Sequence, residues 1–412
     1  MNAFSSPDLS LTTQLIHHAY EPPAGFVAPQ PAVHKASTVI FPDVASLRAR
    51  EWKDKSSYTY GLHGTPTTYQ LEERLATLEG GKQCLLVPSG LAAIANVSLA
   101  LLKTGDEVLI PDNAYGPSKA LAEVELRHYG VRHVVYDPLD PSDLAAKITP
   151  ATQLVWLEAA GSVTMEFPDL PALVRICRQR GVISALDNTW GAGLAFAPFD
   201  LLGDGTLGVD ISVHALTKYP SGGGDVLMGS IVTCHEPLHL RIKLSHMRIG
   251  FGVGGNDVEA VLRSLPSMAL RYRAHDLAAR RLARWLKDQA PVVQVLHPVL
   301  EESPGHAHWL QLCGKACDGE GAAAGLFSVV IDARHGQDQV DAFCDRLRLF
   351  KIGYSWGGPV SLVVPYDLAT MRSRPQPHLQ PGTVVRFSIG LEDVVDLRDD
   401  LAQALSAAFK TA

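Results

Sequence analysis

The sequence contains a series of short segments that are apolar on both faces and have the length of β-strands. They recur at residues 84–87, 107–111, 133–136, 153–157, 182–186, 211–213 and 226–232. Segments with a helical spacing of apolar residues separate most of them, as at 67–80, 91–102, 117–128 and 170–180. Doubly buried strands that alternate with helices are typical of a parallel sheet covered on both faces. The sequence therefore predicts an α/β fold around a mainly parallel, seven-stranded sheet.

The chain has 412 residues, enough for two or three structural units. Residues 1–62 are rich in proline and serine and sustain no long helical period. We therefore expect an N-terminal arm that packs on another part of the protein or contacts the neighbouring subunit. Residues 63–268 carry the apolar segments and form a large domain. Residues 269–412 begin with an Arg-rich helix at 270–289. Strands and helices alternate less regularly after it and predict a smaller α+β domain.

The composition narrows the class of function. The chain is 46% hydrophobic and 19% charged, with a net charge of −7 and no basic run, which argues against a nucleic-acid partner. No apolar stretch reaches the roughly 20 residues that span a bilayer, and the N-terminus lacks the pattern of a signal peptide. Six scattered cysteines suit a reducing compartment, and the pair Cys313 and Cys317 lacks the second pair that a zinc site needs. We expect a cytoplasmic protein with no metal, membrane or nucleic-acid partner.

Lys218 is the residue that most strongly suggests chemistry. It follows an apolar strand, lies between Leu216 and Tyr219, and leads into the glycine-rich stretch 221–225. An amine that attacks an aldehyde must be unprotonated, and removal from water lowers the pKa of a lysine. Taken alone, the same residue could instead extend from a loop into solvent.

Three further groups follow predicted strands. Asp187 ends an apolar strand, where its carboxylate can hold a pyridinium N–H or cap the following turn. Gly90 and Leu91 begin a helix, and the free N–H groups at a helix start can bind phosphate. Tyr115 comes soon after another strand, where its ring can stack on a planar cofactor or pack in the core.

In combination, these groups resemble the Cys/Met-metabolism family of fold-type I enzymes, which use pyridoxal 5′-phosphate (PLP). The resemblance covers nearly the whole chain, from about Val33 to Leu405. Its motifs are Tyr60-Gly61, Gly64-Thr65, Leu78-Glu79-Gly80-Gly81, Pro88–Ala93, Gly161–Glu166, Leu186–Trp190, Thr217-Lys218-Tyr219, Tyr354–Gly358, Arg386 and Ile389–Asp393. It implies the fold-type I architecture, PLP as the cofactor, and a PLP-binding domain at residues 63–268.

The resemblance also implies roles for individual residues around the cofactor. Lys218 would hold PLP as a Schiff base and later carry protons, and Asp187 would pair with the ring nitrogen. Tyr115 would stack on the ring, and Ser162 stands beside it where the family often has asparagine. The phosphate would be bound by the N–H groups of Gly90 and Leu91 and by the hydroxyl of Thr217.

On the substrate side, the resemblance assigns Ser355 to orienting the lysine amine and Arg386 to binding the α-carboxylate. Tyr60 would reach the phosphate and the substrate from the neighbouring subunit. This implies a homo-oligomer, a tetramer built as a dimer of dimers, with active sites between subunits. Trp356 lies in a Ser-Trp-Gly-Gly motif that resembles the β-lyases of the family, whereas γ-synthases and γ-lyases usually carry a smaller residue there.

The implied reaction is a β-elimination in which L-cystathionine gives pyruvate, ammonia and homocysteine, a methionine precursor. Besides Ser162, three positions depart from the family pattern. Leu62 and His63 stand where arginines are usual, and Ala215 replaces a common phosphate-contacting serine. The alternatives are a C–S lyase for cystine or another cysteine S-conjugate, a γ-lyase, or a PLP-binding regulator without catalytic activity.

Overall fold

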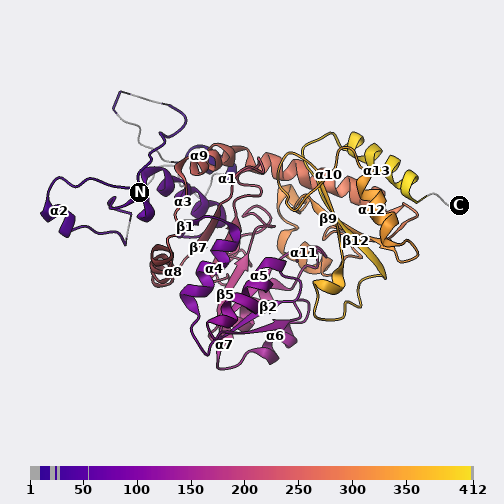
Figure 1. Cartoon of the computed structure of the whole chain (residues 1–412), viewed down its shortest axis with the longest axis horizontal. Coiled ribbons are helices and arrows are strands. Elements are labelled where there is room, and N and C mark those ends of the chain that lie inside the picture. Colours follow the sequence, from indigo (N-terminus) through magenta and orange to yellow (C-terminus); the bar gives the residue numbers. More distant parts are fainter. Residues whose placement is uncertain (1–9, 19–23, 26–27, 54, 410–412) are drawn as a thin grey trace.

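The computed structural model describes residues 10–18, 24–25, 28–53 and 55–409. The described chain forms a large unit and a smaller unit side by side, with an N-terminal arm at the far end of the large one (Figure 1). Residues 1–9, 19–23, 26–27 and 54 of the predicted arm and residues 410–412 of the predicted C-terminal domain lie outside the described residues.

The large unit is built around a seven-stranded sheet in the order β1-β7-β6-β5-β4-β2-β3. Its strands are β1 (Gln83–Val87), β2 (Glu107–Pro111), β3 (Arg132–Tyr136), β4 (Thr152–Glu158), β5 (Ile183–Asp187), β6 (Ile211–Ala215) and β7 (Gly229–Thr233). Strands β2 to β6 pair in parallel, and β7 is antiparallel to both β1 and β6. The predicted mainly parallel sheet of seven strands is confirmed. The segment expected from 226 becomes a strand only at Gly229, because its partner strands β1 and β6 end opposite this residue, at Val87 and Ala215.

Both faces of this sheet are buried. Leu85 and Val87 pack into one apolar core, whereas Cys84 and Leu86 pack into the other. The surrounding helices are α3 (Pro66–Glu79), α4 (Gly90–Leu101), α5 (Gly116–Ala120), the π-helix η2 (Leu121–Leu126), α6 (Pro141–Lys147), α7 (Leu170–Arg180), α8 (Glu236–Ile249) and α9 (Gly255–Ser264). Because helices occupy the faces, a ligand can reach the sheet where the parallel strands end.

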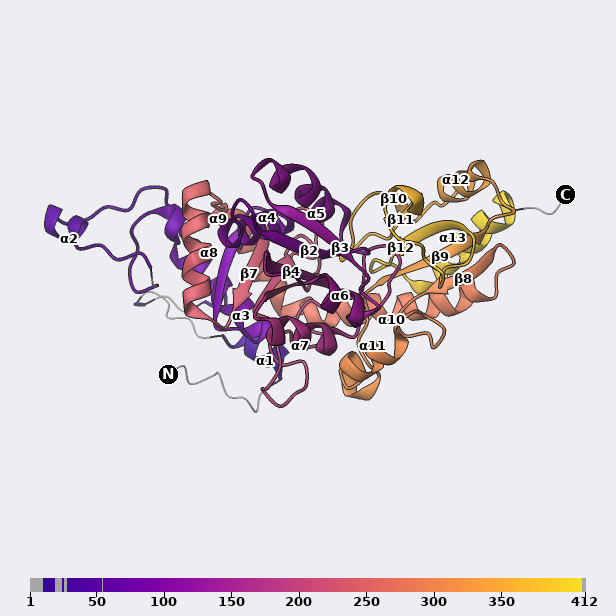
Figure 2. The same cartoon turned by 90° about the horizontal axis from the view of Figure 1, so that it is seen from below.

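The smaller unit contains a five-stranded sheet in the order β10-β11-β12-β9-β8 (Figure 2). Its elements are α10 (Met268–Lys287), β8 (Val292–Leu296), α11 (His306–Cys313), β9 (Leu326–Asp332), α12 (Gln337–Asp345), β10 (Lys351–Ile352), β11 (Leu362–Tyr366), β12 (Gly382–Ser388) and α13 (Val394–Ala408). The mixture of strands and helices expected here is confirmed, but the sequence did not predict β8, β10 or β11. Strand β11 contains Pro365, and a proline weakens the sequence signal of a strand.

The arm carries two short helices, α1 (Leu11–Ile16) and α2 (Val44–Arg48), and ends in the 3-10 turn η1 (Gly61–His63). Helix α1 packs on the large unit through the buried Leu15. Helix α2 instead projects away from the body of the molecule in both views (Figures 1 and 2). Near it, the side chain of Ile40 is 91% exposed. This part of the arm therefore offers apolar surface that its own chain leaves uncovered.

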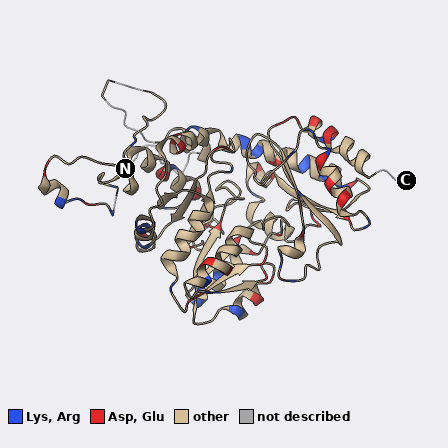
Figure 3. Cartoon of the chain, in the orientation of Figure 1, with Lys and Arg blue, Asp and Glu red and all other residues tan. Residues whose placement is uncertain are grey.

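Charged side chains are distributed over both units. Basic residues lie along α10, while acidic residues lie along α12 and α13 in the same small unit (Figure 3). Among the helices of the described residues, none combines the length and the apolar character needed to cross a membrane.

Candidate active site

A cavity of about 420 Å³ opens where the parallel strands of the large sheet end. Residues from both units line it. All the predicted site residues except Tyr60 are among them: Gly90, Leu91, Tyr115, Ser162, Asp187, Thr217, Lys218, Ser355, Trp356 and Arg386. The groups that the sequence suggested at separate strand ends therefore meet in one space.

Lys218 enters this cavity just after β6. Its Nζ donates a hydrogen bond to Oγ of Ser355, 3.2 Å away, and lies 5.6 Å from the ring centre of Trp356. Burial and the nearby Arg386 guanidinium lower the pKa of Lys218 to about 8, although Asp187 opposes the shift. A lysine with this pKa is neutral in roughly a tenth of the molecules at pH 7, far more than an exposed lysine, and a nucleophile or base requires this neutral form.

Two carboxyl groups from neighbouring strands line the cavity. Asp187 ends β5 and Glu158 ends β4, and the two residues are partners in the parallel pairing. Oδ1 of Asp187 accepts hydrogen bonds from the N–H and the hydroxyl of Thr189, at 3.0 and 2.5 Å, which fix its orientation. Burial raises the pKa of Asp187, and burial together with the Asp187 charge raises the pKa of Glu158 to about 8.

This buried pair fits the ring of PLP. Burial makes the ionised form of each carboxyl group costly in free energy, and a bound cation would offset that cost. A protonated pyridine nitrogen is such a cation, and the oriented carboxylate of Asp187 is the group that would hold it. Sequence reasoning missed the part that Glu158 plays here. The signal was present, because Glu158, like Asp187, is an acidic residue at the end of an apolar strand.

The phosphate end of the cofactor fits the start of α4. Ser89 caps this helix, because its side chain accepts the N–H of Ala92 at 3.0 Å. Ser89 thus occupies the N–H of Ala92, whereas the N–H groups of Gly90 and Leu91 are left for an anion in the cavity. A side chain at Gly90 would place its Cβ 2.6 Å from Cβ of Ala215, so only glycine fits this close contact. The Thr217 hydroxyl makes only long contacts to Met228, at 3.4 and 3.5 Å.

Tyr115 forms another wall of the cavity. It precedes α5, and its N–H donates to Oε2 of Glu158 at 2.8 Å. The residue is 43% exposed and lines the cavity, so it is accessible to a planar ligand. Ser162 is held nearby, because its N–H donates to the carbonyl of Asn113 at 2.9 Å.

Arg386 brings a buried positive charge to the cavity from β12 of the small unit. The residue is only 9% exposed, and its guanidinium lies 5.2 Å from the ring centre of Tyr366. In the described part of the chain, no carboxylate lies within ion-pair distance of it. A buried guanidinium without an acidic partner is suited to a small anion such as the α-carboxylate of an amino acid.

Tyr60 lies away from the cavity of its own chain. Its side chain is 44% exposed, and its ring meets His63 edge-on at 5.8 Å between centres. His63 in turn shares a hydrogen bond with the Thr59 hydroxyl at 2.7 Å, and burial lowers its pKa. The contribution of Tyr60 from a neighbouring subunit stays a prediction.

Comparisons with known proteins agree with this geometry. The model of a family described as "Cys/Met metabolism PLP-dependent enzyme" matches residues 12–406. The chain is 38% identical to a putative cystathionine beta-lyase of Rhizobium johnstonii, over 97% of this chain and 96% of that protein. It is 34% identical to the cystathionine beta-lyase MetC of Escherichia coli, over 96% of this chain and 98% of that one. The crystal structure of metB from Corynebacterium glutamicum is similar at a TM-score of 0.85 and 27% identity, covering 98% and 99% of the two chains.

Proposed function

Because the chain belongs to the Cys/Met metabolism family of PLP-dependent enzymes, we propose that it is a carbon–sulfur lyase that cleaves L-cystathionine by β-elimination. The observation that carries the proposal is the meeting of three groups in one cavity: the amine of Lys218, the strand-end carboxylate of Asp187 and the unpaired guanidinium of Arg386. Together they can bind an amino acid and remove its Cα proton. Relatives named cystathionine beta-lyase support this choice of substrate.

When bound, PLP supplies an electron sink that stabilises negative charge at Cα of the substrate. Asp187 would hold the ring nitrogen in its protonated state, and Arg386 would bind the α-carboxylate of the substrate. Ser355 orients the amine of Lys218, which removes the Cα proton. The Cβ–S bond then breaks, its electron pair leaves with sulfur, and the Lys218 ammonium returns a proton to the thiolate. The three-carbon product, 2-aminoacrylate, is hydrolysed to pyruvate and ammonia.

The choice among substrates is open to a direct test, because Leu62 and His63 stand where arginines are usual. We expect kcat/KM for L-cystathionine to exceed the values for L-cystine and S-methyl-L-cysteine by about 10-fold or more. Steady-state rates with the three amino acids would check this. Rapid turnover of cystine without turnover of cystathionine would instead assign the protein to a lyase for another cysteine S-conjugate. Binding of PLP without turnover of any of them would favour a regulator.

The proposal includes a cytoplasmic homo-oligomer, a dimer of dimers in which Tyr60 enters the site of a neighbouring copy. The projecting arm and the exposed side chain of Tyr60 support this arrangement. The six free cysteines support a reducing compartment such as the cytoplasm. We expect inactive Lys218→Ala and Tyr60→Ala chains to regain activity when they are mixed, because a hybrid dimer holds one site with both native residues. Sedimentation would measure the assembly state. A fully active monomer, or a mixture that regains nothing, would contradict the arrangement.

A further inference from the structure

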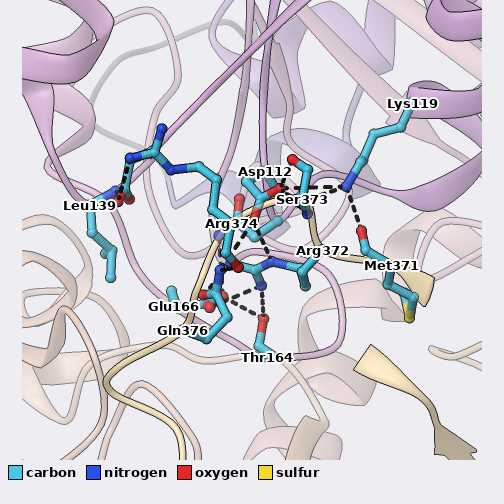
Figure 4. A network of polar contacts seen from close by, with 12 residues as sticks. Asp112, Lys119, Leu139, Thr164, Glu166, Met371, Arg372, Ser373, Arg374 and Gln376 are labelled. Atoms are coloured by element: carbon cyan, nitrogen blue, oxygen red, sulfur yellow. Dashed lines mark hydrogen bonds and ion pairs between the residues drawn. The ribbon is translucent and has the colours of Figure 1, made fainter. Parts of the chain in front are cut away.

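A segment of the small unit reaches across to the large unit beside the active cavity. We call residues 368–378 the strap. Within it, Arg372 has a side chain that is only 7% exposed and lies between two acidic residues of the large unit. Its Nε donates to Oδ2 of Asp112 at 2.8 Å, and its Nη1 donates to Oε1 of Glu166 at 3.0 Å (Figure 4). Arg372 is thus a buried link between the two units.

The rest of the strap reinforces this link. Oδ1 of Asp112 accepts the N–H and the hydroxyl of Ser373, at 2.9 and 2.7 Å. His378 lies 3.0 Å from Oε1 of Glu166, and Lys119 donates to the carbonyl of Met371 at 2.5 Å. Met371, which directly precedes Arg372, lines the active cavity. The contacts of Arg372 therefore fix one wall of the site.

The two acidic residues belong to the loops that carry cofactor-facing groups. Asp112 is three residues before Tyr115, and Glu166 is four residues after Ser162. The loops are also tied to each other, because Nδ2 of Asn113 donates to Oε2 of Glu166 at 3.2 Å. A displacement of either carboxylate would therefore move Tyr115 or Ser162.

The positive charge of an arginine is needed between Asp112 and Glu166 because both carboxyl groups are buried. Asp112 and Glu166 are 1% and 0% exposed, and burial alone would raise the pKa of each carboxyl group. The hydrogen bonds of Arg372 and Ser373 reverse this effect at Asp112, whose pKa is lowered. At Glu166 the hydrogen bond of His378, followed by the Arg372 charge and the Thr164 hydroxyl, lowers the pKa to about 2. The other ionisable groups that face the pair are Lys119, 3.8 Å from Asp112, and His378 beside Glu166. Without Arg372, part of the negative charge would remain buried and uncompensated.

We propose that Arg372 is a positioning residue of the active site. From the small unit, it holds the two loops that place Tyr115 and Ser162 around the cofactor and sets Met371 in the cavity wall. The inference rests on the assignment of this cavity to PLP, whereas the substrate proposed above bears only on turnover. Measuring PLP affinity separates the two, because binding needs no substrate.

The test compares Arg372→Met with Arg374→Met. Arg374 lies on the same strap, but its side chain is 35% exposed and makes only longer contacts to Asp137 and Asp143, at 3.8 and 3.5 Å. PLP is titrated into each apoprotein, and its dissociation constant is measured. We expect Arg372→Met to bind PLP roughly 10- to 100-fold more weakly than the unaltered protein. Arg374→Met should stay within about twofold of it.

The loss should depend on pH. In Arg372→Met fewer contacts oppose the burial of the two carboxyl groups, so the pKa of each should be higher than in the unaltered protein, and more of their charge appears as the pH rises. The defect in PLP affinity should therefore grow between about pH 6 and about pH 9. Arg372→Lys keeps the charge without the forked hydrogen bonds, and should show a smaller loss that varies little with pH. If Arg372→Met does not fold, the loss of PLP affinity can still be measured by comparing Arg372→Lys with Arg374→Met.

One result would overturn the proposal. Arg372→Met, or Arg372→Lys if the first variant does not fold, would melt at a lower temperature, yet its dissociation constant for PLP would equal that of Arg374→Met at both about pH 6 and about pH 9. Arg372 would then serve only stability. If the unaltered protein binds PLP but does not cleave cystathionine, the proposed substrate fails while this inference stands.

Discussion

Replacement of Lys218 by alanine is expected to abolish both turnover and the covalent attachment of PLP. The variant lacks the only amine that we place at the reacting atoms, with its pKa of about 8. Loss of a general base alone slows an enzyme by roughly 10²- to 10⁴-fold, and loss of the attachment point adds to this. Dialysis followed by visible absorbance and a pyruvate assay would measure both effects.

Ser355→Ala is the matched control for this variant. It removes the oxygen that accepts the Lys218 hydrogen bond at 3.2 Å but leaves the amine in place. We expect the control to keep its yellow colour after dialysis and to lose about 10-fold in kcat, as the loss of one hydrogen bond predicts. A yellow and fully active Lys218→Ala protein would refute the assignment of Lys218.

Asp187→Asn is expected to have the second largest effect. Asparagine keeps the shape of the side chain but has no charge, so it cannot hold the ring nitrogen protonated. Removing one preorganised electrostatic group of this kind typically lowers kcat by about 10²- to 10³-fold. Comparison of kcat with saturating PLP would show this loss, while the absorbance of bound PLP would show that the site is still filled.

Glu158→Gln, on the neighbouring strand, tests whether Asp187 is the carboxylate that holds the ring nitrogen. Burial and the Asp187 charge raise the pKa of Glu158 to about 8, so its carboxyl group is mostly neutral at neutral pH. A neutral amide then changes little, and we expect less than about 10-fold loss in kcat. A larger loss for Glu158→Gln than for Asp187→Asn would instead make Glu158 the partner of the ring nitrogen.

Much of the large unit could be predicted from the sequence, because its strands are apolar on both faces. That pattern placed Asp187 and Lys218 at strand ends, and parallel pairing brings such ends to one edge. The small unit gave a weaker signal. Strand β11, whose Tyr366 lies beside Arg386 in the cavity, contains Pro365 and was not predicted.

The link through Arg372 could not be predicted. Asp112 and Arg372 are 260 positions apart, and nothing local to either residue indicates the other. Arg372 also lies in a segment that is mostly irregular, where hydrophobic periodicity gives no information. Its role follows only from tertiary contacts, whereas Lys218 and Asp187 are marked by the strands that precede them.

This cavity is expected to break the Cβ–S bond of L-cystathionine. Product analysis tests this most directly: the PLP-loaded protein is incubated with L-cystathionine, and the keto acid and the thiol are identified by mass spectrometry. We predict equal amounts of pyruvate and homocysteine. Formation of 2-oxobutyrate and cysteine, which requires cleavage on the other side of the sulfur, would contradict it.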